Sequence, residues 1–215
     1  MVLMFVVLML ATPATAGPWP RGEGEQFLSI SIETPTTAKT ASQAFASAYY
    51  ERGLPQQWTI GLDNGQDGLG YRKSYLFLRR PILAGRSAMV AAELGVGHQT
   101  TSVGSGFAVR PALSWGRGLR MLGRDGWLSI DSTYAYLPRR QTAVFKTEIT
   151  FGLSLDNRTK TILQAAYEKE RSRPSSITIT PSMTYKVTSR AHLLAGAILS
   201  ADDDPKLKLG LWVAF

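Results

Sequence analysis

The sequence contains no cysteine among its 215 residues. A disulfide scaffold, a thiol nucleophile and the cysteine-rich zinc sites are therefore excluded. Histidine is nearly as scarce, because His98 and His192 are the only two in the chain. An enzyme that depends on an imidazole base thus has two candidates, and an enzyme that depends on a thiol has none.

Beyond residue 16 the sequence also lacks long hydrophobic runs, since charges or turn residues interrupt it about every ten positions. A transmembrane helix needs about 20 apolar residues, so a helical membrane protein is excluded. Residues 1–16 differ, because an apolar run there is followed by Pro13 and by Ala14-Thr15-Ala16. This pattern is typical of a secretory signal cleaved before Gly17. We expect residues 1–16 to be a signal peptide and residues 17–215 to form one exported domain.

The feature that dominates the rest of the sequence is an alternation of apolar and polar residues, with hardly any helical stripe. The alternating segments cover more than half of residues 17–215, far above the ~20–25% strand content of ordinary globular proteins. We therefore predict an all-β fold, a closed up-and-down antiparallel barrel of about twelve strands, or ten if two weak segments are misread. The segments are 26–33, 45–52, 58–63, 74–80, 87–96, 107–116, 127–136, 142–154, 161–169, 176–186, 191–200 and 207–215.

Each segment has an apolar face and a polar face. In 142–154, Phe145 and Ile149 share one face, while Lys146 and Glu148 share the other. A membrane barrel turns its apolar face to lipid, whereas a soluble sandwich buries that face in its core. The alternation fits both a membrane barrel and a soluble sandwich. Only the barrel also accounts for the secretory signal, the missing disulfides and the apolar last segment. We expect the lumen to be lined by Glu93, Arg110, Asp131, Lys146, Glu148, Glu168, Lys186 and Lys208.

The connections and the aromatic residues favour the same interpretation. Three connections after even-numbered segments read as short polar turns, whereas several after odd-numbered segments are longer or more charged. Short turns at one end are typical of outer-membrane barrels, where they face the periplasm. Aromatic residues near segment ends are expected to form interfacial girdles; these are Trp58, Tyr75, Trp115, Trp127, Tyr136, Tyr167 and Tyr185.

The last nine residues, LKLGLWVAF, place apolar side chains at every second position up to Phe215. This stretch resembles the final strand of Gram-negative outer-membrane β-barrels. With the GPWPRGEG stretch that starts at Gly17, the sequence is also similar to a group of small proteobacterial barrel proteins. The resemblance implies insertion in the outer membrane and, during biogenesis, contact with periplasmic chaperones. It further implies that the barrel-assembly machinery recognises Leu209, Leu211, Val213 and Phe215.

The chain is basic, with a formal net charge of +8. An exported barrel does not routinely meet nucleic acid, so we expect the partners to be outer-membrane lipid and lipopolysaccharide. Guanidinium groups could pair with lipopolysaccharide phosphates, although a generic charged loop explains the same residues equally well. The possible contacts are Arg72, Lys73, Arg139, Arg140, Arg171 and Arg173.

Catalytic chemistry is poorly supported. A lipid-modifying outer-membrane enzyme would need a hydroxyl, an imidazole and an orienting group together, and neither histidine lies in such a motif. Asp202-Asp203-Asp204 could collect Ca²⁺ through carboxylate oxygens, but the run lacks spaced ligands and reads better as a solvated hairpin. We predict no catalytic residues, no cofactor and no metal site.

The sequence thus predicts a narrow channel or transport-related barrel with a polar, charged lumen. If the lumen charges pair completely, the barrel is a plugged structural or lipopolysaccharide-interacting protein instead. If several stay unpaired, the net basic field should favour anions.

Overall fold

The computed structural model describes residues 17–37, 43–85, 88–201 and 203–215. The signal peptide predicted at residues 1–16 lies outside this part of the chain, as does Ser87, where one strand was expected to begin. The described residues form twelve strands. They are β1 (Gln26–Pro35), β2 (Phe45–Gly53), β3 (Thr59–Asp67), β4 (Arg72–Ala84), β5 (Ala88–Thr101), β6 (Gly104–Met121), β7 (Arg124–Leu137), β8 (Thr142–Ser154), β9 (Thr159–Glu170), β10 (Ser176–Lys186), β11 (Ala191–Ser200) and β12 (Lys206–Ala214).

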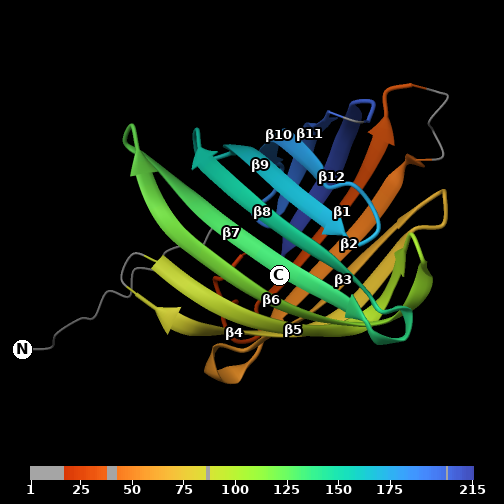
Figure 1. The fold of residues 1–215 in the computed structure, drawn as a ribbon. Helices are drawn as coiled ribbons and strands as arrows, with labels where there is room; N and C mark the ends of the chain where they lie inside the picture. Colours follow the sequence, from red (N-terminus) through yellow and green to blue (C-terminus); the bar gives the residue numbers. More distant parts are fainter. Residues whose placement is uncertain (1–16, 38–42, 86–87, 202) are drawn as a thin grey trace, which may run out of the picture.

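The strands form one closed barrel. Each strand pairs antiparallel with its neighbours in sequence, and β1 pairs with β12 to close the ring. The strands cross the barrel obliquely (Figure 1), as closure of a twisted sheet requires. The prediction of a closed antiparallel barrel of about twelve strands is confirmed, and the ten-stranded alternative is wrong. Among the described residues no helix is long or apolar enough to span a bilayer.

The chain ends inside the sheet. Phe27 of β1 lies opposite Ala214 of β12, and Glu33 lies opposite Lys208. One further rung joins Gln26 and Phe215, whose amides donate to each other's carbonyls at 3.2 and 3.0 Å. The expected pairing of the last segment with the first is therefore confirmed, and no edge of β1 or β12 is left unpaired.

The outer surface of the barrel is apolar. Large apolar side chains on alternate positions of the strands are exposed, among them Leu94 and Leu209, each 56% exposed, and Ile177, 60% exposed. A soluble protein rarely exposes so extensive an apolar surface, whereas a membrane barrel must present one to hydrocarbon. The sandwich alternative is therefore wrong, and the alternate set of side chains faces the lumen.

The barrel has two ends. We call the loop end the one where 36–44, 68–71, 102–103, 138–141, 171–175 and 201–205 connect the strands. The terminal end holds 54–58, 85–87, 122–123, 155–158 and 187–190, together with Gly17 and Phe215. The predicted length asymmetry is small, because 102–103 at the loop end is as short as 122–123 at the terminal end. The 3-10 turn η2 (Pro55–Gln57) lies at the terminal end, and the 3-10 turn η3 (Pro138–Arg140) lies at the loop end.

Candidate functional site: the barrel lumen

The lumen contains a cavity of about 620 Å³ at the loop end, which we call the lumen cavity. Inward-facing residues of all twelve strands line it, from Glu33 of β1 to Lys208 of β12. Loop residues complete it, among them Leu69, Arg173 and Asp203. The cavity is thus built by closure of the barrel and belongs to no single hairpin.

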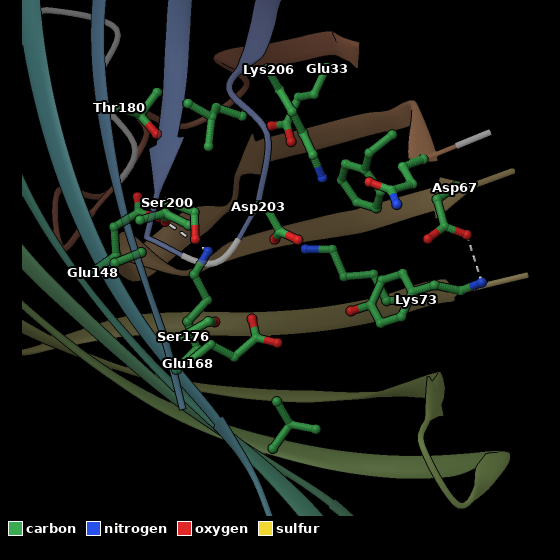
Figure 2. Close-up of a pocket in the computed structure, with 18 of the residues that line it drawn as sticks. Glu33, Asp67, Lys73, Glu148, Glu168, Ser176, Thr180, Ser200, Asp203 and Lys206 are labelled. Carbon is green, nitrogen blue, oxygen red and sulfur yellow. Dashed lines mark hydrogen bonds and ion pairs between the residues drawn. The ribbon is translucent and has the colours of Figure 1, made fainter. Parts of the chain in front are cut away.

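Charges of both signs face each other across this cavity. Figure 2 shows side chains such as Glu33, Lys73 and Glu168 projecting from different strands into the same space. The acidic lining residues are Glu33, Asp63, Asp67, Glu148, Glu168, Asp203 and Asp204, and the basic ones are Lys73, Arg110, Lys146, Arg173, Lys206 and Lys208. Because the two sets nearly balance, the cavity wall does not carry the basic excess of the whole chain. The net basic field that would favour anions is absent from its described lining.

Several of these charges are paired. Lys208 Nζ lies 3.2 Å from Glu33 Oε1, across the β1–β12 seam. Lys146 Nζ lies 3.1 Å from Glu148 Oε2, and Gln164 donates to the other oxygen of Glu148 at 2.7 Å. Each pair joins neighbouring inward positions of the barrel wall.

A continuous layer of ion pairs bounds the cavity on the β2–β6 side. Arg110 Nη1 lies 2.5 Å from Asp63 Oδ2, and Arg110 Nη2 lies 3.2 Å from Glu93 Oε1. Glu93 Oε2 is 3.8 Å from Arg79, whose other terminal nitrogen pairs with Glu51. We call this set, Glu51, Asp63, Arg79, Glu93 and Arg110, the charged layer. It joins five adjacent strands through alternating signs, so every charge in it has an opposite neighbour.

Aromatic rings hold the guanidinium groups of the charged layer in place. Arg110 lies over the ring of Tyr75, 4.2 Å from its centroid, and Tyr75 in turn donates to Gln99 at 2.6 Å. Arg79 lies 5.7 Å from the ring centroid of Phe77. Tyr75, Phe77 and Arg79 are all buried on the inner face of β4. Cation–π contacts and burial thus add to the ion pairs and restrict movement of the layer.

Beyond the charged layer, residues 17–25 cross the lumen at the terminal end. We call this segment the strap. Its start lies against β6 and β7, because Pro18 packs on Gly116 and Gly17 lies close to Ser129. Its other end lies against β2, where Gly24 donates to the carbonyl of Gly53 at 3.0 Å. Since β2 and β7 lie on opposite sides of the ring, the strap spans the barrel.

Arg21 anchors the strap. Its Nε lies 2.7 Å from Glu51 Oε2, and its guanidinium lies 4.5 Å from the ring centroid of Phe27. Burial lowers the pKa of Arg21 to about 10, so the side chain remains charged at neutral pH. Gly53 makes room for the strap, because a Cβ there would come within 2.0 Å of the Gly22 carbonyl oxygen. The strap is therefore joined to the charged layer through Glu51.

The structure places all eight residues predicted for the lumen on the inner face of their strands. Glu93 and Arg110 belong to the charged layer, and Lys146, Glu148, Glu168 and Lys208 line the cavity. Asp131 lies deeper and accepts a hydrogen bond from Ser129 at 3.2 Å. Lys186 lies at the terminal end, away from the other seven, where β10 ends.

Sequence reasoning missed Glu51, Asp63 and Arg79, which are central to the charged layer. Arg79 lies in a strand whose inner face also carries Tyr75 and Phe77, so β4 shows little contrast between its faces. The strap was missed as well, because its contacts are with residues far away in sequence. The alternation of side chains could have found Arg79, because a residue four positions after Tyr75 lies on the same face of the strand as Tyr75.

The rim residues predicted to contact lipopolysaccharide divide into several groups. Lys73 lies near the loop end with its side chain toward the lumen, where its Nζ is 2.9 Å from Asp63 Oδ1. Its contact with lipopolysaccharide stays a prediction. Arg140 and Arg171 donate to the carbonyls of Ser105 and Gln141 at 3.1 and 3.0 Å. Arg173 lines the cavity, whereas Arg72 and Arg139 are exposed at the loop end.

Other expected positions also need correction. The Gly, Ser and Thr residues around His98 predict a loop, but His98 lies within β5 and is exposed on the outer face. Tyr75 and Trp127, expected in the aromatic girdles, are buried on the inner face. Asp203 and Asp204 line the cavity, and Thr37 donates to Asp204 at 2.8 Å, while Asp202 lies outside the described residues.

No protein-family model matches the sequence, and a search of curated proteins finds no match. Solved structures do match the fold. A KdgM porin is similar with a TM-score of 0.65 and 9% identity, covering 88% of this chain and 99% of its own. A NanC porin gives a TM-score of 0.66 at 9% identity, covering 86% and 98%. The COG4313 outer-membrane channel from Pseudomonas putida F1 gives 0.55 at 9% identity, covering 94% and 99%. At such identities the likeness is one of fold.

Proposed function

We propose that this chain is an outer-membrane channel for small polar solutes. The observation that carries the proposal is the lumen cavity, about 620 Å³ of polar space that all twelve strands enclose. The apolar outer surface supports a location in lipid. The fold that the chain shares with two porins and an outer-membrane channel supports both the outer membrane as that location and transport as the role.

The lumen favours solutes without a large net charge. The cavity wall carries nearly equal numbers of acidic and basic side chains, and Phe45, Tyr71 and Tyr75 add aromatic surface beside them. One KdgM porin was solved in complex with disordered oligogalacturonate, a polyanion. In this chain a polyanion would meet as many carboxylates as cations. We therefore propose neutral or zwitterionic solutes as its substrates.

Passage is restricted at the terminal end. The charged layer and the strap together occupy the lumen between the cavity and that end on the β1–β7 side. A solute that enters from the loop end must pass beside them. The wild-type channel is therefore expected to be narrow, and movement of the strap would widen it.

Swelling of liposomes that contain the purified barrel tests the proposal. Uncharged sugars of increasing size should enter at decreasing rates. Ala166 lines the cavity, whereas its neighbour Ala165 faces outward, so Ala166→Trp should slow swelling severalfold and Ala165→Trp should leave it unchanged. Swelling that is absent in the wild type, or equal in the two variants, would favour the non-conducting barrel, whose supporting observation is the pairing of the charged layer.

We also propose that the last strand carries the assembly signal. The backbone of Phe215 pairs with Gln26, while its side chain remains 56% exposed. Leu209, Leu211 and Val213 lie on the same outer face of β12 as the Phe215 side chain. The face is thus available to the assembly machinery, and to chaperones before insertion, without loss of the pairing that closes the barrel.

Lipopolysaccharide contact at the loop end is proposed for Arg72 and Arg139. Both are exposed there, and exposed guanidinium groups can make bidentate hydrogen bonds with phosphate oxygens. Arg140 and Arg171 would have to exchange a loop carbonyl for a phosphate, so their contribution is expected to be smaller.

A further inference from the structure

A cluster of basic side chains lies on the lumen face at the terminal end, away from the lumen cavity. Lys160 is the second residue of β9, Lys186 is the last residue of β10, and His192 is the second residue of β11. Lys186 lies directly opposite His192, and Lys160 lies opposite Thr184, which shares the inner face of β10 with Lys186. Two lysine side chains and an imidazole, from three neighbouring strands, therefore meet on one patch. We call these three residues the basic patch.

The basic patch lacks a protein counterion. Among the ion pairs of residues 17–37, 43–85, 88–201 and 203–215, none includes Lys160, Lys186 or His192. The adjoining turn carries Asp156, but this carboxylate accepts the backbone N–H groups of Arg158 and Thr159 at 2.6 and 2.8 Å. Lys160 and Lys186 are diagonal neighbours on the inner face, and like charges at such positions repel each other. The arrangement thus leaves positive charge that a mobile anion would neutralise.

Buried hydroxyls beside the basic patch have no partner either. Thr184 is fully buried and Ser182 is 8% exposed, and neither Thr184 Oγ1 nor Ser182 Oγ makes a hydrogen bond within the described protein. A hydroxyl buried without a partner is unfavourable by about 1–3 kcal/mol. Thr184 lies between Lys160 and Lys186 on the inner surface, so an oxygen-rich anion held by the two ammonium groups would be positioned next to its O–H.

The wall of the patch on the β7–β8 side is aromatic. Trp127 lies over Gly152, where a Cβ would come within 2.2 Å of the indole ring. Lys160 Nζ is 5.7 Å from the centroid of that ring. The glycine therefore lets the indole lie against β8, where it faces the ammonium group of Lys160 on the side away from β10.

We propose that Lys160, Lys186, His192 and the hydroxyl of Thr184 form a binding site for a small soluble oxyanion of the phosphate or carboxylate class. Ammonium groups serve as point charges for such anions, and a ring of basic side chains is a common way to hold them in a pore. The four side chains face the lumen, so the anion comes from solution and not from a lipid headgroup. The site stands on these residues and does not depend on whether the barrel conducts.

Calorimetric titration of the purified barrel with inorganic phosphate, at constant ionic strength, tests the site. The wild type should bind phosphate, and Lys160→Gln and Lys186→Gln should each weaken binding about tenfold, the effect of losing one charged hydrogen bond. Arg158→Gln is the matched control, because Arg158 lies at the same end but in the exposed turn 155–158. It should leave the affinity unchanged.

Thr184→Val separates binding from folding. Valine keeps the shape and removes an oxygen that has no partner in the unliganded barrel, so the variant should unfold at the same or a higher urea concentration while phosphate binding weakens severalfold. Heat-modifiable migration on gels verifies that each variant is folded. If a lysine variant does not fold, His192→Gln is tested in its place. Absence of phosphate binding in the wild type, or equal affinity in the lysine variants and Arg158→Gln, would overturn the site.

Discussion

At the scale of single residues, the lumen is organised by charges that are buried or nearly buried. Glu51 is fully buried, and two guanidinium groups, those of Arg21 and Arg79, hold its carboxylate oxygens. A buried charge without a partner is strongly unfavourable, while a buried pair is close to neutral in stability. The charged layer therefore persists because each member would be unfavourable alone.

Arg79→Met should destabilise the barrel markedly. The change leaves Glu51 and Glu93 with one cationic partner fewer, and breaking a buried pair lowers the free energy of unfolding by about 3–5 kcal/mol. Urea unfolding, followed by tryptophan fluorescence, measures the effect. Arg80→Met is the control, because Arg80 is exposed and lies over the ring of Trp58, 5.4 Å from its centroid. This variant should lose less than about 1 kcal/mol. Equal losses in the two variants would contradict this account of the layer.

Sequence reasoning reached part of this layer and not the rest. Glu93 and Arg110 could be assigned to the lumen because they are charged residues on the polar face of clearly alternating segments. Arg79 and Asp63 could not, since β4 is aromatic on its inner face and β3 was expected to end at Asp63, whereas it continues to Asp67. The pairing itself depends on register between strands, which a single sequence does not reveal.

At the scale of elements, the strap depends on glycines of the wall that it crosses. A Cβ at Gly116 would come within 2.7 Å of both Pro18 Cγ and Trp19 Cη2, whereas a Cβ at Gly118, two residues later on β6, meets nothing within 4 Å. Substitutions at Gly116 and Gly118 therefore distinguish loss of contact with the strap from a general effect of replacing a glycine in a strand.

Gly116→Val should expose the start of the strap. Because the chain has no cysteine, Pro18→Cys creates a single thiol at a buried strap position, and its reaction with a maleimide reports access. Labelling should be slow in Pro18→Cys alone, at least severalfold faster when Gly116→Val is added, and unchanged when Gly118→Val is added. If the two valine variants are labelled at the same rate, the proposed packing of Pro18 on Gly116 is wrong.

The strands were more predictable than the strap for a physical reason. An outer face against lipid and an inner face against a polar lumen impose a period of two, which is visible in β8 and β10 without any tertiary information. The strap obeys no period, because its residues contact opposite walls, with Pro18 on β6 and Arg21 on β2. Only closure of the ring brings those walls within reach.

At the scale of the whole molecule, the apolar outer surface determines the environment. Leu94 lies near the middle of β5 on that surface, while Leu122 lies at the tip of the β6–β7 turn and is 89% exposed. Arginine near the bilayer midplane is unfavourable by about 2–4 kcal/mol and far less so outside the hydrocarbon. Leu94→Arg should therefore reduce the fraction of folded, heat-modifiable barrel recovered in phospholipid vesicles. Leu122→Arg should match the wild type, and similar recovery of both variants would argue against a lipid-facing β5.

The central claim is that solutes cross the lumen beside a strap that closes part of the terminal end. Single-channel recording in planar bilayers, on the wild type and on Arg21→Ala, tests it most directly. The wild type should give small conductance steps, and Arg21→Ala should give larger ones, because the strap loses its ion pair with Glu51. Steps of equal size in the two proteins, or no steps in either, would contradict the claim.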